Sequence, residues 1–152
     1  LQQNKVKYIA PFVSLVHAVD SLRLLQEINR QALRCGRVIP CLLELHIAQE
    51  ESKYGFTPEA CEAMLAAGEW KALTGVEITG LMCMASNTDD EAQIRREFHL
   101  AHKLFLRYKS LYFADKEYFK ECSWGMSHDY PIAVEEGATL VRVGSYIFGE
   151  RI

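Results

Sequence analysis

The sequence lacks the features that would assign it to a membrane, a secretory or a nucleic-acid-binding class. The longest apolar run, residues 76–85, is interrupted by Glu77 and Thr79 and falls short of the roughly 20 residues that a membrane span needs. The first seven residues are mostly polar and contain no signal-peptide core. A net charge of −3 without any basic run predicts no nucleic-acid partner and no membrane-surface partner, because phosphate groups bind basic surfaces.

Cysteine pairs at metal-binding or redox spacing are also missing. The five cysteines form an odd set without a C-x-x-C motif, which argues against a disulfide framework and against a zinc site. Cys41, Cys83 and Cys122 lie in apolar stretches, where a reduced thiol behaves as a small hydrophobic group. We therefore predict no metal and a cytoplasmic, reducing location.

Strand-like and helix-like patterns alternate along the chain. Apolar runs predict strands, and capping residues followed by helical periodicity predict helices between them. The strands are expected at residues 12–19, 38–47, 76–85, 119–124 and 139–143. The helices are expected at residues 22–33, 57–68, 90–105 and 130–136, with a turn or short helix at 144–149. Almost wholly apolar strands that alternate with helices indicate an α/β fold with a parallel sheet covered by helices.

Two α/β architectures compete, an open doubly wound sheet and a closed barrel. The dinucleotide-binding version of the open sheet needs a G-x-G-x-x-G after its first strand, and none follows residues 13–19. A (β/α)₈ TIM barrel has about 250 residues, so five of its eight units would occupy roughly 156. We predict that residues 1–152 form a single domain, the C-terminal portion of such a barrel with about five strands, and that the chain begins inside a larger fold.

Two clusters of polar and small residues follow the last two predicted strands, at the barrel end where active sites and phosphate sites form. In the first, Gly125 and Ser127 precede a helix, so backbone N–H groups and a hydroxyl can face an anion. The alternative is an ordinary turn in which Ser127 or Asp129 only caps the helix.

The second cluster contains Arg142, Gly144 and Ser145. Arg142 stands in an apolar strand, where burying an unpaired guanidinium would be costly. Its alternative role is an ion pair with a core carboxylate such as Glu44. Gly144 permits close backbone approach and Ser145 supplies a hydroxyl, so the two clusters together suggest a phosphate site beside a cation.

Five segments, in this order, carry a resemblance to a known family. They are Leu1-Gln2-Gln3-Asn4-Lys5, Glu50-Glu51-Ser52-Lys53-Tyr54-Gly55, Gly80-Leu81-Met82-Cys83-Met84-Ala85, Gly125-Met126-Ser127 with Asp129, and Val141-Arg142-Val143-Gly144-Ser145 with Ile147-Phe148-Gly149. They resemble the YggS/PROSC family of pyridoxal 5′-phosphate (PLP)-binding proteins, single-domain relatives of the alanine racemase N-terminal barrel. The resemblance extends over the whole chain, and the last two segments are its most specific part.

The resemblance implies roles for individual residues. Ser127, Gly144 and Ser145 would hold the cofactor phosphate, and Arg142 would face the pyridine nitrogen, where a cation disfavours protonation. The resemblance also places Met82, Met84 and Asn4 near the cofactor, and Lys5 lies next to Asn4. The two methionines would serve equally well as core, and Trp124 stands where the family usually has Met.

The lysine to which PLP is attached in this family lies on the first strand, upstream of the Leu1–Lys5 motif. Covalent attachment is therefore not expected in this chain, whose site would bind PLP non-covalently and would also accept phosphate or sulfate. The implied function is a non-catalytic PLP carrier in PLP homeostasis, with PLP-dependent apo-enzymes as partners. The alternatives are a PLP-dependent racemase-like enzyme, and an inactive barrel fragment that oligomerises through exposed strand edges.

Histidines offer weaker candidates. His99 and His102 are three residues apart on the long predicted helix, a spacing that can bind metal, but a solvated charged face is the expected reading. His17 and His46 fall in predicted strands and are expected to be core histidines with satisfied hydrogen bonds.

Overall fold

A computed structural model of the chain describes residues 1–51 and 54–151. Ser52 and Lys53, which belong to the second motif above, and Ile152 lie outside the described residues. The elements are η1 (Gln3–Lys5), α1 (Val6–Ile9), β1 (Val16–Val19), α2 (Leu22–Arg34), β2 (Ile39–Leu45), α3 (Pro58–Ala67), η2 (Glu69–Ala72), β3 (Val76–Cys83), α4 (Glu91–Tyr112), β4 (Glu121–Met126), α5 (Tyr130–Glu135), β5 (Leu140–Arg142) and α6 (Ser145–Phe148).

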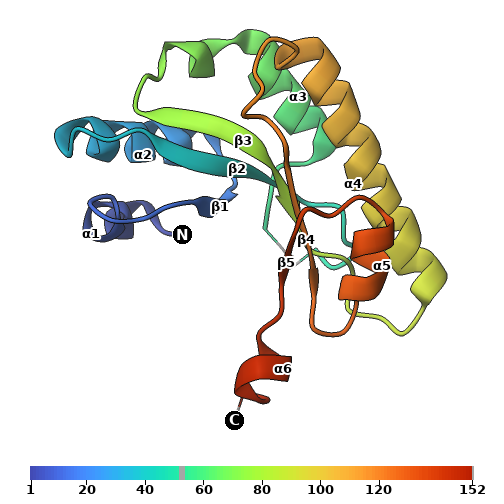
Figure 1. Cartoon of the computed structure of the whole chain (residues 1–152). Helices are drawn as coiled ribbons and strands as arrows, with labels where there is room; N and C mark the ends of the chain where they lie inside the picture. Colours follow the sequence, from blue (N-terminus) through green and yellow to red (C-terminus); the bar gives the residue numbers. More distant parts are fainter. Residues whose placement is uncertain (52–53, 152) are drawn as a thin grey trace.

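The five strands form one parallel sheet in the order β1-β2-β3-β4-β5, which is also their order in the sequence. The sheet curls, and helices α2 to α5 lie outside it (Figure 1). This curled half-barrel confirms the prediction of a partial (β/α)₈ barrel with five strands. None of the helices in the described part of the chain is long and apolar enough to cross a membrane.

The helices begin where the sequence supplies caps. The Ser21 hydroxyl accepts the Leu24 N–H at the start of α2, and the Thr57 hydroxyl accepts the Ala60 N–H at the start of α3. Asp90 caps α4 by accepting from the backbone of Ala92 and Gln93. Such caps stabilise a helix by about 1 kcal/mol each, so these three starting points are encoded locally.

The first strand is shorter than predicted. Residues 12–15 are not part of β1, because the preceding turn is held by hydrogen bonds from the N–H groups of Phe12 and Val13 to the carbonyl of Ile9. Arg37 fixes the same turn by donating to the carbonyls of Ala10 and Val13. The apolar run at 12–19 therefore combines a helix-ending turn with a four-residue strand.

The core lies between the sheet and the outer helices. Leu25, Ile28, Phe98 and Ala101 from α2 and α4 belong to one buried apolar cluster with strand residues such as Trp124. Burial of large apolar side chains such as these contributes about 1.5–3 kcal/mol each. The residues between them on each strand face the opposite, concave side of the sheet, since successive strand side chains alternate.

β3 and β4 approach each other closely at Gly80. This glycine has a φ of 157°, and a Cβ at its position would collide with the carbonyl oxygen of Glu121. Only glycine fits here, because any side chain would push the two strands apart.

Candidate functional site

Two neighbouring strands, β4 and β5, end side by side and bring the two predicted clusters together. Met126 and Arg142 are register partners, so the residues that follow each strand begin at the same edge of the sheet. The backbone N–H of Tyr146 donates to the Ser127 hydroxyl over 3.3 Å. Ser127, Gly144 and Ser145 are therefore close in space, although 17 positions separate the first two.

A cavity of about 690 Å³ opens at this edge, and we call it the cup. It is lined by Asn87, Met126, Ser127, His128, Arg142, Gly144, Ser145, Phe148, Gly149, Glu150 and Arg151. Its volume is in the range of small-molecule sites, which bury most of a ligand with a few polar groups. A Cβ built at Gly144 would meet no atom within 4 Å, so a ligand can approach the backbone there.

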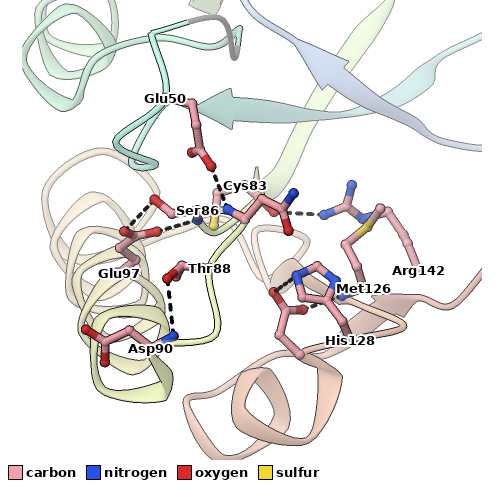
Figure 2. A network of polar contacts seen from close by, with 11 residues as sticks. Glu50, Cys83, Ser86, Thr88, Asp90, Glu97, Met126, His128 and Arg142 are labelled. Carbon is pink, nitrogen blue, oxygen red and sulfur yellow. Dashed lines mark hydrogen bonds and ion pairs between the residues drawn. The ribbon is translucent and has the colours of Figure 1, made fainter.

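Arg142 is held beside the cup by backbone carbonyls. Its Nη2 donates to the carbonyl of Cys83 at 2.8 Å (Figure 2) and to that of Ser123 at 3.4 Å. Its buried Nε has no hydrogen-bond partner among the described residues. Burial lowers the pKa of Arg142, whereas Cys83, Glu44 and Asp129 raise it. The side chain forms no ion pair with Glu44 within the described part of the chain, so the alternative role considered for Arg142 is not observed.

The concave face of the sheet carries a second polar contact. His17 on β1 lies 3.0 Å from the Ser123 hydroxyl on β4 through its Nδ1, across two intervening strands. Burial, followed by the charge of Arg142, lowers the pKa of His17. This partly buried histidine thus has a partner, as expected, and it lies on the same inner wall as Ser123. For His46 the expectation was wrong, because its buried Nδ1 has no hydrogen-bond partner among the described residues.

Asp129 shapes the turn between β4 and α5. Its side chain is 1% exposed, and its Oδ1 accepts the Met126 N–H at 2.7 Å. It stands at the N-cap position of α5 but makes no side-chain hydrogen bond to that helix. The Ser127 hydroxyl accepts from Tyr146 in the C-terminal segment. These hydrogen bonds tie the turn to the end of β4 and to α6, and Asp129 does not act as a simple helix cap.

A buried carboxylate fixes the loop on the other side of the cup. Both oxygens of Glu97 on α4 accept from Ser86, one from its N–H at 2.7 Å and one from its hydroxyl at 2.8 Å (Figure 2). The Ser86 hydroxyl in turn accepts the Gln49 N–H, and the Asn87 N–H donates to Glu50. Glu97 thereby ties the loops after β2 and β3 together and positions Asn87 at the cup.

Of the seven predicted site residues, four line the cup: Ser127, Arg142, Gly144 and Ser145. Met82 is 5% exposed, and Met84 lines a separate small hollow with Glu44 and Tyr54. Asn4 is exposed in η1 and borders a third hollow, with Asp20 and Ser21. The structure therefore does not bring the two methionines or Asn4 into the cup.

The lining residues that sequence reasoning did not select include His128 and Asn87. His128 lies inside the Gly125–Asp129 motif, so its adjacency to Ser127 was the available signal. Asn87 precedes the helix expected at residues 90–105, and no local pattern connects it with the residues from 126 onward that line the cup.

The remaining candidates lie away from the cup. His99 is exposed on α4 with its Nδ1 3.2 Å from a Glu136 oxygen, and His102 meets the edge of Trp124. The five cysteines are free, and burial raises the pKa of the Cys41 thiol to about 12. Across residues 1–51 and 54–151, no three His, Cys, Asp or Glu side chains are grouped so that they could hold a metal ion.

The fold and the cup together define a parallel α/β half-barrel whose small-molecule cavity lies at the carboxyl ends of its strands. The family of the alanine racemase N-terminal domain matches residues 2–152, and the chain belongs to this family. This membership confirms the resemblance proposed from the motifs.

Individual relatives agree with this family. A pyridoxal phosphate homeostasis protein of Aquifex aeolicus is 35% identical over 152 residues, which cover 99% of this chain and 64% of the relative. The chain thus spans just under two thirds of the length of that curated relative. PipY of Synechococcus elongatus PCC7942, solved without PLP, is 32% identical with a TM-score of 0.88, covering 98% of this chain and 67% of PipY.

Two further structures extend the comparison. PipY with PLP bound is 31% identical to this chain, with a TM-score of 0.84 over 98% of it and 67% of PipY. An alanine racemase of Clostridium difficile has a TM-score of 0.74 at 16% identity, over 99% of this chain and 38% of the racemase. The second likeness shows a shared fold alone.

Proposed function

We propose that this chain forms the phosphate- and ring-nitrogen-binding side of a PLP-binding protein that acts in PLP homeostasis. The observation that carries the proposal is the meeting of Ser127, Gly144, Ser145 and Arg142 in one cavity at the ends of β4 and β5. The relatives named for PLP homeostasis and the PLP-bound structure of PipY support the choice of ligand.

The groups lining the cup fit a phosphate monoester attached to an aromatic ring. Ser127 and Ser145 offer hydroxyl donors, and the open space at Gly144 allows phosphate oxygens to approach the backbone. Hydrogen bonds to an ionised group are roughly twice as strong as neutral ones, so a few well-placed donors are sufficient to fix a phosphate.

Arg142 gives the site its chemical character. PLP, when bound, supplies an aldehyde and an electron-withdrawing pyridine ring. A guanidinium beside the pyridine nitrogen disfavours protonation of that nitrogen, because two neighbouring positive charges repel. Arg142 thus weakens the ring as an electron sink, which favours a carrier over an enzyme acting on amino acids.

The proposal extends to the setting of the protein. PLP-dependent apo-enzymes would be the recipients, and the free thiols, four of them buried, suit a reducing cytoplasm. Residues 1–152 would act as one domain. Self-association through the open edges of β1 and β5 remains a prediction, and the molar mass in solution measured by light scattering would test it.

Calorimetric titration of the whole protein with PLP and with pyridoxal tests the ligand assignment. Ser127→Ala and Ser145→Ala should each weaken PLP binding about tenfold or more, because each removes a hydrogen bond to a charged group. Pyridoxal, which lacks the phosphate, should be affected far less. Ser110→Ala, at an exposed position of α4, is the matched control. Unchanged PLP affinity in both cup variants would refute the phosphate assignment.

A further inference from the structure

His128 occupies a position in the cup that the proposed function does not use. It lies between Ser127 and Asp129 in the turn after β4, lines the same cavity as Gly144 and Ser145, and its side chain is 51% exposed. An imidazole here can reach a ligand in the cup, and its exposure allows it to exchange protons with solvent.

A buried carboxylate orients this imidazole. The Nε2 of His128 is 3.3 Å from Oδ2 of Asp129, an oxygen without a hydrogen-bond partner among the described residues (Figure 2). The other oxygen, Oδ1, is already engaged by the Met126 N–H. The carboxylate therefore favours a proton on Nε2, and in the neutral tautomer this leaves the Nδ1 lone pair as an acceptor.

The other charged side chains around the cup are Arg142, Glu150 and Arg151, and none of them is next to the proposed phosphate donors in the turn after β4. Arg142 is engaged with the carbonyls of Cys83 and Ser123 on the inner wall, and Glu150 and Arg151 bring opposite charges to the C-terminal rim. The donors proposed for the phosphate, Ser127 and Ser145, are both neutral. His128 directly follows Ser127 in the sequence and lines the same cup, so it can add a cation to this set of donors.

We propose that His128 is a phosphate-binding residue that tightens the cup when it is protonated. The proposal rests on the proposed function and adds a cation that sets the affinity for phosphorylated ligands. With both ring nitrogens protonated, Nε2 stays with Asp129 and Nδ1 becomes a donor, so the imidazolium attracts phosphate. The neutral imidazole offers neither the charge nor that donor.

The test is calorimetric titration with PLP and with pyridoxal, at about pH 6 and about pH 8.5. The titration compares the wild-type protein with the variants His128→Gln and His128→Lys. The control variant is His99→Gln, which replaces an exposed histidine on α4. Because the ligand phosphate also titrates near pH 6, the informative quantity is the ratio of variant to wild-type affinity at each pH.

We expect His128→Gln to weaken PLP binding about fivefold at the lower pH and to match wild type at the higher pH, as suits a half-exposed charged contact. His128→Lys should keep the tight affinity at both values, and pyridoxal binding should change in neither variant. An equal loss for PLP and pyridoxal, or no loss with His128→Gln, would overturn the proposal. Failure of the wild type to bind PLP at all would instead refute the proposed function, and this inference with it.

Discussion

Replacing Glu97 with alanine should lower the free energy of unfolding by about 3 kcal/mol. The carboxylate is 8% exposed and accepts from the Ser86 N–H, the Ser86 hydroxyl and the Gln93 amide at 2.7, 2.8 and 3.0 Å. A hydrogen bond to a charged group contributes about 1.5–3 kcal/mol, and a buried N–H without a partner costs about 1–3 kcal/mol. The total stays below the sum, because the Gln93 amide can turn to water and the Ser86 hydroxyl still accepts from Gln49.

Glu97→Gln separates the hydrogen bonds from the charge. Its amide oxygen can still accept the Ser86 N–H, so the loss should be about 1 kcal/mol. Arg96→Ala, at the adjacent exposed position of α4, should change stability by no more than about 0.5 kcal/mol.

Urea unfolding followed by circular dichroism measures these differences as shifts in the midpoint at constant slope. A loss below about 1 kcal/mol for Glu97→Ala would refute the reasoning, because the buried Ser86 N–H would then have found another partner. PLP titration of the same variant should also show weaker binding, since the loop that places Asn87 at the cup loses its anchor.

Three other predictions follow from single contacts. Burial and the charge of Arg142 lower the pKa of His17 from 6.5. The unfolded state therefore binds more protons than the folded state as the pH falls below that value, and the free energy of unfolding decreases. The urea midpoints at about pH 7 and about pH 5 should differ less in His17→Gln than in wild type. Gly80→Ala should cost more than about 3 kcal/mol or prevent folding, because its methyl group would meet the Glu121 carbonyl, and a thermal melt with wild-type midpoint would contradict this. Gly144→Ala should keep its melting temperature yet weaken PLP binding, since its methyl group enters the open cup; unchanged calorimetric affinity would show that the ligand does not approach this backbone.

The sequence predicted the elements that have strong local signals. The helices expected from residues 22, 57 and 90 begin within one residue of those positions, after the caps Ser21, Thr57 and Asp90, and the apolar runs around Leu43 and Leu81 are strands of the sheet. The short helices at the N-terminus were not predicted, because a four-residue helix has too little periodicity to be recognised and is held by contacts such as that of Arg37.

The candidate site was predictable only in part, for a similar reason. Ser127 and Ser145 follow consecutive strands, so the rule that parallel strands end at one edge was enough to bring them together. Asn87 reaches the cup through the Glu97–Ser86 contact, which depends on how α4 packs against the loop. Alternation along the apolar run at residues 76–85 could place Met82 and Met84 on one face but could not show that β3 ends at Cys83 or how far the two methionines lie from the cup.

The strand order has a consequence for how the protein is made. Each strand pairs with the strand that precedes it in the sequence, so neighbours in the sheet are also neighbours in chain order. Synthesis proceeds from the N-terminus, and contacts near in sequence form early. The sheet can therefore be laid down one unit at a time as the chain emerges. The cup needs β4, β5 and α6 and cannot form before these elements have been made, so ligand binding reports that synthesis of this region has been completed.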